Sequence, residues 1–173
     1  MQSTRILLEG RPGSGKTTLA HRIVTALRER GISVTGFTTE EMRESGRRVG
    51  FAIETADGER GILAHVDLPG PPRVGKYGVD LSALERLAIP SLEAASGSIV
   101  VIDELGKMEL ASDQLQGAVE VLFASSANVV ATVHTFRHPF TDDLKERPDV
   151  ERLHVTAANR DHLARILVRK LAT

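Results

Sequence analysis

The sequence predicts a three-layer α/β fold, with a mostly parallel sheet between two layers of helices and a short antiparallel β insertion. Short apolar runs alternate along the chain with segments of helical periodicity, which is the pattern of repeated β–α–β units. Between about residues 38 and 78 the helical segments are missing, and alternating residues with turn signals take their place. We therefore expect residues 1–173 to form one domain that carries an insertion at about 38–78.

The first β–α–β unit opens the chain. Residues 5–9 form a short, largely apolar run, which suits the centre of a parallel sheet. Residues 16–29 carry leucine and isoleucine at helical spacing, and Gly31 is placed to end that helix. Residues 32–37 are expected to form the next strand.

The insertion has the signals of antiparallel strands. Residues 49–55 alternate, and the Asp-Gly pair at 57–58 is typical of a hairpin turn. Further short strands are expected at 60–64 and 73–77, and three prolines just before the second of these mark a loop.

The rest of the chain returns to alternating helices and strands. Asp80 is placed to cap a helix that runs to about Ser96, with Pro90 bending or breaking it. The remaining strands are expected at 98–102, 128–133 and 153–155, and the remaining helices at 110–124, 140–147 and 159–171.

Between the first strand and the first helix lies a run that fits the phosphate-loop pattern G-x-x-x-x-G-K-[ST] at every fixed position. Its glycines permit backbone angles closed to other residues, and its successive amide N–H groups can surround an anion. Lys16 supplies a mobile positive charge for the β- and γ-phosphates, and the Thr17 hydroxyl can ligate Mg²⁺. These features predict a three-layer P-loop NTPase fold. Nucleotide binding is assigned to Gly10, Arg11, Pro12, Gly13, Ser14, Gly15, Lys16, Thr17 and Thr18.

Two carboxylates follow the strand expected at 98–102. Asp103 and Glu104 lie at its carboxyl end, the edge of the sheet where the phosphate loop also lies. Asp103 is placed to hold Mg²⁺, and Glu104 is placed to orient or deprotonate a water that attacks the γ-phosphate. The alternative is that Asp103 caps the next helix and Glu104 is merely solvated.

Bulk composition argues against several classes of protein. The formal net charge is −1, from 22 Lys and Arg against 23 Asp and Glu, so the basic surplus typical of polynucleotide binding is missing. No stretch approaches the roughly 18–20 apolar residues of a membrane span, and no signal peptide is evident. Without cysteine there is no thiol catalysis. We expect a cytoplasmic monomer that binds neither membranes nor nucleic acid.

Several stretches together point to one family. They are the phosphate loop at 10–18, the segment 36–51, and the sequence DELGKMEL at 103–110, with shorter matches at 73–81 and 155–160. In these stretches the chain resembles the small nucleoside-triphosphatases first known from hyperthermophiles, whose vertebrate relative is called cancer-related nucleoside-triphosphatase. The phosphate loop is shared with many families, whereas the segment after Asp103 is much more specific.

That resemblance implies an adenylate-kinase-like or RecA-like fold. It also implies Mg²⁺-dependent hydrolysis of ATP, GTP and other nucleoside triphosphates to the diphosphate and phosphate, with loose base specificity. Lys107 is then a candidate catalytic residue that would neutralise transition-state charge, as an arginine finger does. Arg160 is a candidate to stack on the nucleotide base or bond its edge. Leu105 stands where we expect isoleucine, which is a conservative departure.

Other charged residues have two interpretations each. Arg43, Arg47 and Arg48 would reach the γ-phosphate or a second substrate, or they would form a charged hairpin tip. Arg147 would belong to a lid, or it would be structural. Glu109 would pair with Lys107 or cap a helix, and we favour a structural role.

His134 and His138 are spaced like a metal pair, but the strand and proline around them rule out a shared helix face. Since no third ligand is evident, we assign no zinc. Asn159 is a good helix N-cap, which we prefer to a role in binding.

Two other functions compete with hydrolysis. A nucleotide or nucleoside kinase would need an acceptor pocket, for which the arginines of the insertion and Tyr77 are candidates. A GTP-dependent switch would fit the D-x-x-G pattern at 103–106, but the guanine-specific N-K-x-D pattern is missing, and residues 159–162 fail it at two positions.

Overall fold

The computed structural model describes residues 2–173. Its strands are β1 (Arg5–Glu9), β2 (Val34–Glu44), β3 (Arg47–Thr55), β4 (Arg60–His65), β5 (Arg73–Val74), β6 (Tyr77–Val79), β7 (Ile99–Leu105), β8 (Asn128–Val133) and β9 (Glu151–His154). Its helices are α1 (Lys16–Glu29), α2 (Leu81–Ser91), α3 (Asp113–Ala124), α4 (Pro139–Glu146) and α5 (Arg160–Leu171), with a 3₁₀ turn, η1, at Glu109–Ala111.

These strands form one sheet in the order β5-β6-β4-β3-β2-β7-β8-β1-β9. The half from β2 to β9 is parallel, and the half from β3 to β5 is antiparallel, which confirms the predicted fold class. β2 takes part in both halves, because Val34–Phe37 pair with β7 and Phe37–Glu44 pair with β3. β8 lies between β1 and β7, so one strand separates the strand before the phosphate loop from the strand that carries Asp103.

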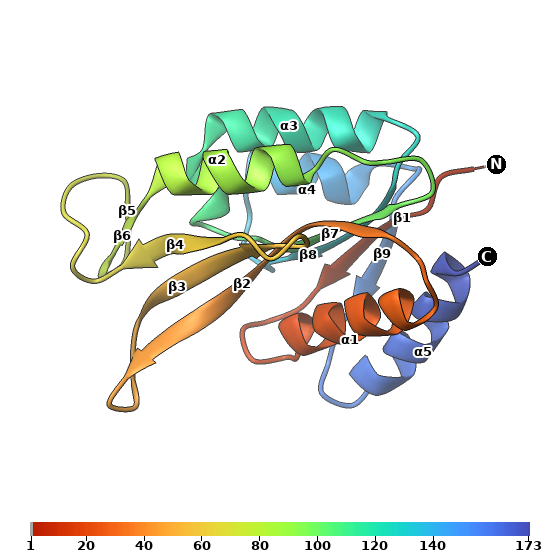
Figure 1. Cartoon of the computed structure of the whole chain (residues 1–173), viewed down its shortest axis with the longest axis horizontal. Helices are drawn as coiled ribbons and strands as arrows, with labels where there is room; N and C mark the ends of the chain where they lie inside the picture. Colours follow the sequence, from red (N-terminus) through yellow and green to blue (C-terminus); the bar gives the residue numbers. More distant parts are fainter. Residues whose placement is uncertain (1) are drawn as a thin grey trace.

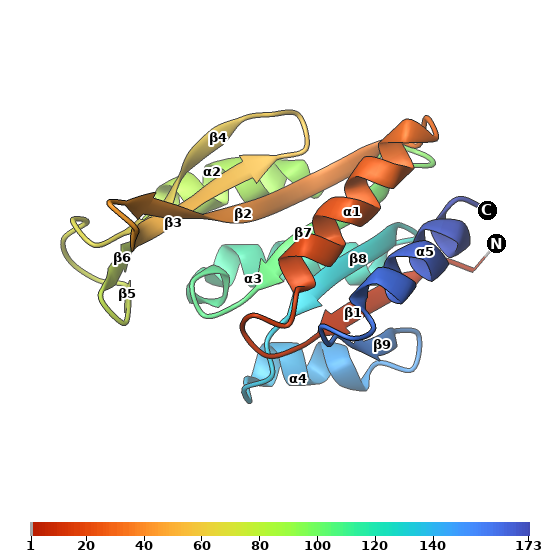
Figure 2. The same cartoon turned by 90° about the horizontal axis from the view of Figure 1, so that it is seen from below.

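Helices cover both faces of the parallel half. α1 and α5 lie side by side on one face, and α3 and α4 lie on the other; α2 lies on that second face too, but over β2, β3 and β4, so it mainly covers the antiparallel half (Figures 1 and 2). The alternation along each strand fills both layers: Ile6 and Leu8 pack with α1 and α5, whereas Leu7 packs on the opposite face. Such two-sided burial explains why these strands are apolar throughout.

Several element bounds differ from the sequence-based expectation. β2 continues to Glu44 instead of ending at 37, because the hairpin grows directly out of a core strand. α2 ends at Ser91 instead of Ser96, since Pro90 occupies its last turn. The helix expected from 110 begins at Asp113, where the Ser112 side chain accepts the Leu115 N–H as an N-cap.

Within residues 2–173, none of the helices combines the length and the apolar character that crossing a bilayer requires.

Candidate active site

The phosphate loop connects the carboxyl end of β1 to the first turn of α1, as the sequence predicts. Gly13 and Gly15 have φ angles of +79° and +98°, which disfavour any residue with a Cβ. The Lys16 side chain is buried and folds back, with Nζ donating to the carbonyl oxygen of Gly10 at 2.6 Å. Arg11, Pro12, Gly13, Thr17 and Thr18 are exposed, so this part of the loop is open to a ligand.

Asp103 points to the same face of the sheet as α1. Along β7 its side chain is in phase with Ile99 and Val101, which pack under α1. One carboxylate oxygen, Oδ1, accepts from the hydroxyls of Thr132 at 2.6 Å and Thr17 at 3.3 Å. The other, Oδ2, is buried without a hydrogen-bond partner in the part of the chain that the structure describes. Burial is the main reason why the pKa of Asp103 is raised.

This arrangement fits a magnesium ion. Thr17 and Asp103 present hard oxygen ligands next to the phosphate loop, and the unpartnered Oδ2 of Asp103 is a buried acceptor that lacks a donor. Magnesium prefers one or two carboxylates together with substrate phosphates, and this geometry offers that set.

Glu104 lies beside the phosphate loop as well. Its Oε2 is 3.2 Å from Nζ of Lys16, and its side chain keeps a third of its surface exposed, at 34%. The peptide bond between Asp103 and Glu104 is cis. The two neighbouring carboxylates have different partners: Asp103 contacts hydroxyls, and Glu104 contacts Lys16 of the phosphate loop.

Arg160 covers the loop from the first turn of α5. A Cβ on Gly15 would lie 2.7 Å from Cδ and 2.8 Å from Nη1 of Arg160, so this side chain lies directly against the loop. The buried Nε of Arg160 lacks a hydrogen-bond partner among residues 2–173. This nitrogen makes a long ion pair with Oδ1 of Asp161, at 3.7 Å, and the guanidinium group at the loop is also suited to an anionic or aromatic ligand.

Lys107 does not lie at the lysine–carboxylate pair. It is exposed, and its Nζ lies 5.1 Å above the centroid of the Phe136 ring. Phe136 in turn stacks on His134, with ring centroids 3.2 Å apart. Two contacts fix His134: its Nε2 is 2.9 Å from the Thr141 hydroxyl, and Lys145 donates to its carbonyl oxygen at 2.8 Å. The loop after β8 thus forms a platform for Lys107, which we call the Phe136 platform.

His134 and His138 each make contacts of their own. His134 is buried, and this burial lowers its pKa to about 4. His138 caps α4, with Nδ1 accepting from the Phe140 N–H at 3.2 Å. Each ring therefore has a packing or capping role, and no cluster of three metal-binding side chains exists within the described chain.

The arginines of the insertion have partners of their own. Arg43 and Arg48 both contact Glu41, at 2.8 and 2.9 Å, and Arg48 also donates to the Tyr77 hydroxyl at 3.1 Å. They lie on the hairpin of β2 and β3, which projects away from the helices (Figure 1). The side chain of Arg47 is exposed at the same tip.

Two more residues prove structural. Arg147 donates to Asp149 and to the carbonyl oxygen of Phe123, so it joins the end of α3 to the start of β9. Asn159 makes no cap hydrogen bond at its own position; instead it and Thr156 bond each other's backbone N–H, a reciprocal capping box with Thr156 as the cap.

Sequence reasoning missed two contributors to the site, Thr132 and Phe136, and it considered Glu109 only as a partner of Lys107 or a helix cap. Thr132 bonds Asp103, Phe136 supports Lys107, and Glu109 is buried next to Glu104. The signals were present but weak. Thr132 is a lone hydroxyl in an apolar strand, and Glu109 stands between Met108 and Leu110 in an otherwise apolar turn.

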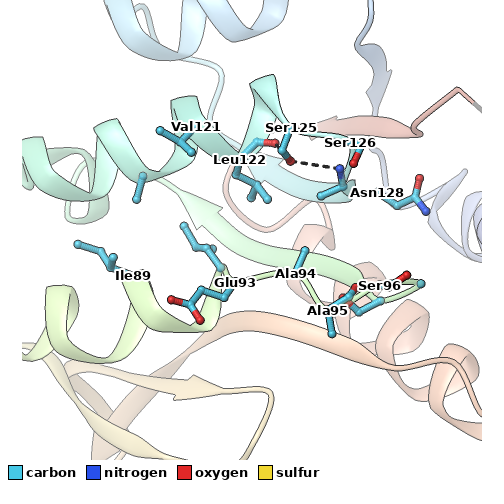
Figure 3. A pocket seen from close by; sticks show the side chains of 15 residues that line it. Ile89, Glu93, Ala94, Ala95, Ser96, Val121, Leu122, Ser125, Ser126 and Asn128 are labelled. Atoms are coloured by element: carbon cyan, nitrogen blue, oxygen red, sulfur yellow. Dashed lines mark hydrogen bonds between the residues drawn. The ribbon is translucent and has the colours of Figure 1, made fainter.

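A cavity of about 620 Å³ lies elsewhere, between the end of α2 and α3 (Figure 3). It is lined by Ile89, Leu122 and the segments that precede β7 and β8, so it opens at the amino ends of those strands. Glu93 is its only charged lining residue within the described chain. The chemistry therefore belongs to the opposite edge of the sheet.

Comparison with known proteins extends these findings. A family model described as NTPase matches residues 5–168. Nucleoside-triphosphatase THEP1 of Thermotoga sp. (strain RQ2) is 48% identical over 161 residues, which cover 92% of this chain and 90% of that protein. The human cancer-related nucleoside-triphosphatase is 40% identical over 173 residues, which cover 91% of each chain.

Two solved structures are similar along nearly the whole chain. The crystal structure of THEP1 from the hyperthermophile Aquifex aeolicus has a TM-score of 0.86 at 34% identity, covering 97% of this chain and 99% of that one. The solution structure of the human cancer-related nucleoside triphosphatase has a TM-score of 0.84 at 38% identity, covering 98% and 97%.

Proposed function

The chain belongs to the NTPase family of nucleoside-triphosphatases, and from this premise we propose that it hydrolyses ATP, GTP and other nucleoside triphosphates with magnesium. The products are the nucleoside diphosphate and phosphate. We further propose that the base is selected only loosely, because the candidate binding groups are backbone amides, Lys16 and Arg160, which address phosphates and ring faces.

The observation that carries this proposal is the contact between Lys16 and Glu104. Their side chains lie 3.2 Å apart at the mouth of the phosphate loop. A bound γ-phosphate competes for the ammonium group of Lys16, since a phosphate carries more charge than a single carboxylate. Nucleotide binding would thereby release Glu104 from its ion pair, and the freed carboxylate would orient the attacking water and accept its proton.

Thr17 and Asp103 would hold the magnesium ion that accompanies the nucleotide. When bound, the ion neutralises charge that develops on the phosphate oxygens. Thr132 would keep Asp103 aligned through its 2.6 Å hydrogen bond to Oδ1, the oxygen that Thr17 also contacts.

Two more cations complete the proposed site. Arg160, which lies on Gly15, would contact the nucleotide next to the loop, by its phosphate or by stacking on the base. Lys107, held over the Phe136 ring, would stabilise the transition state at the γ-phosphate.

The test is phosphate release from ATP, GTP and CTP in the presence of magnesium, with no added acceptor. We expect wild type to hydrolyse several triphosphates. We expect Glu104→Gln to bind nucleotide normally and to lose about 10²–10³-fold in kcat, because the amide cannot accept the proton of water. Glu120→Gln, the same change at an exposed position of α3, is the matched control and should behave as wild type.

Unchanged turnover in Glu104→Gln would remove Glu104 from the mechanism. Turnover that appears only with a nucleotide or nucleoside acceptor would favour a kinase instead. A strong preference for GTP with slow release of GDP would favour a switch. We also propose a cytoplasmic monomer that does not act on nucleic acid, on the basis of the balanced charge, and sedimentation of the purified protein tests the monomer.

A further inference from the structure

Glu109 is a buried carboxyl group next to the candidate base. It lies in the 3₁₀ turn η1, and only 5% of its surface is exposed. The flanking residues Met108 and Leu110 pack into the core on that side of the sheet. Water therefore cannot solvate a charge on this group, and an isolated buried carboxylate is strongly unfavourable.

Glu109 also lacks a cationic partner among residues 2–173. Lys107, two residues earlier, is exposed and lies over Phe136. The one side-chain hydrogen bond of Glu109 is to the backbone: Gly106 N–H donates to its Oε2 at 3.2 Å. Neutral carboxyl groups need no counter-charge, and this environment suits the neutral form.

The Glu104 side chain also lies next to Gly106. A Cβ placed on Gly106 would lie 3.0 Å from Oε1 of Glu104 and 3.2 Å from Oε2 of Glu109. Gly106 thus separates two carboxyl groups, and the missing side chain is what lets both approach. Glu109 therefore holds, through the Gly106 N–H, the turn against which the Glu104 side chain lies.

We infer that Glu109 is a positioning residue: its buried side chain anchors the Gly106 turn and thereby fixes the position of the Glu104 side chain, which lies against the same glycine. Glu104 is the one that is partly exposed and faces Lys16, whereas Glu109 is enclosed. This inference rests on the proposed role of Glu104 as the base. It assigns a task to a residue that does not touch the substrate.

The electrostatics of Glu109 agree with its role as a buried anchor. Burial raises the pKa of Glu109 to about 8, and the negative charges of Glu104 and Asp103 add to the effect. A neutral carboxyl group can stay buried beside Gly106 without a cationic partner.

The experiment measures kcat and KM separately for Glu109→Leu and Glu109→Gln, with circular dichroism to check folding. Glu109→Leu removes the acceptor of the Gly106 N–H, and we expect kcat to fall about 10- to 100-fold with KM nearly unchanged. Glu109→Gln is neutral and keeps an acceptor for that N–H, so it should recover most of the lost turnover. Glu120→Leu, on the exposed face of α3, is the control for the substitution itself.

A third variant covers the case in which Glu109→Leu does not fold. Gly106→Ala introduces the Cβ that contacts both carboxyl groups, and we expect it to lower kcat while nucleotide binding persists. Wild-type kcat in a folded Glu109→Leu or in Gly106→Ala would overturn the inference. A Glu109→Gln variant as impaired as Glu109→Leu would overturn it too, because a charged Glu109 would then be required. Full activity of Glu104→Gln is a separate outcome, which refutes the base assignment itself.

Discussion

Charged residues are numerous both at the carboxyl edge of the parallel strands and in the antiparallel hairpin. The two regions differ in whether these charged side chains are buried and whether they are paired. At the carboxyl edge, Lys16, Asp103 and Glu109 are all buried. Oδ2 of Asp103 and Nε of Arg160 are buried there without a hydrogen-bond partner from the described chain. In the hairpin region, by contrast, Glu41 and Arg60 are exposed and each pairs with two opposite charges.

The difference shows which region is built for a ligand. Exposed pairs such as those of Glu41 contribute only about 0–1 kcal/mol each, and losing one disturbs little. A buried polar atom without a partner costs about 1–3 kcal/mol, so folding alone gives no reason to keep it. A nucleotide with its metal ion would supply the missing partners at the carboxyl edge. Four predictions test this contrast, from the largest expected effect to the smallest.

Lys16→Ala should have the largest effect on turnover. Removing this ammonium group takes away the charge that faces the γ-phosphate, and we expect kcat/KM to fall about 10³-fold or more. Lys76→Ala is the matched control, since Lys76 is an exposed lysine of the antiparallel half that lies over the Tyr77 ring. The rate of phosphate release is measured for both variants. Equal losses in Lys16→Ala and Lys76→Ala would show that the difference between the two regions does not matter for turnover.

Glu109 and Glu41 should give opposite dependences of stability on pH. The folded-state pKa of Glu109 is about 8, above its ordinary value of 4.5, so the folded protein binds more protons between these values. The free energy of unfolding therefore falls as pH rises from 4.5 to 8, by on the order of a few kcal/mol. Glu109→Gln lacks this loss, and its stability relative to wild type should increase with pH across that window.

The pKa of Glu41 is lowered by hydrogen bonds from Arg48 and Arg43, so its contribution is present above 4.5 and disappears as pH falls through the folded-state pKa. Because Glu41 is exposed, solvent screens this term, and Glu41→Gln should change the pH profile only slightly. Urea denaturation at several pH values measures both variants. A Glu109→Gln difference that stays constant from pH 5 to 8 would contradict the neutral assignment.

Phe136→Leu should have an intermediate effect. It removes the ring under Lys107, and a cation–π contact of this kind is worth about 0.5–1 kcal/mol, so we expect kcat to fall about two- to fivefold. Phe51→Leu is the counterpart in the antiparallel half, where Arg48 lies 5.4 Å from the ring centroid. That variant should lose stability and keep its kcat. If Phe136→Leu also keeps full kcat, Lys107 does not depend on the platform.

Arg43→Gln should have the smallest effect. Its partners, Glu41 and the carbonyl oxygen of Gly46, belong to the same hairpin and are exposed. We expect turnover within about twofold of wild type and stability within about 0.5 kcal/mol. A tenfold loss of activity would instead indicate that the hairpin binds substrate, and it would support the kinase hypothesis.

The sequence alone determined the local parts of this protein. The phosphate loop, its Lys16 and Thr17, and the acidic end of β7 were all predicted, because each depends on a short motif between elements of clear periodicity. The mixture of a parallel core with an antiparallel insertion was likewise predicted, since the turn signals and alternation of the insertion are local. The placement of Arg160 against the loop is consistent with its predicted role, which still awaits a direct test.

Only the tertiary structure decided how distant residues meet. Thr132 reaches Asp103 because β8 lies next to β7 with the same phase, and no local pattern encodes that neighbour. Lys107 meets Phe136, and Glu109 meets Glu104, through packing between separate segments or around a tight turn. A sequence motif specifies which groups a site contains. Strand order and burial decide which of these groups are removed from water, and burial changes their pKa values and limits their hydrogen-bond partners.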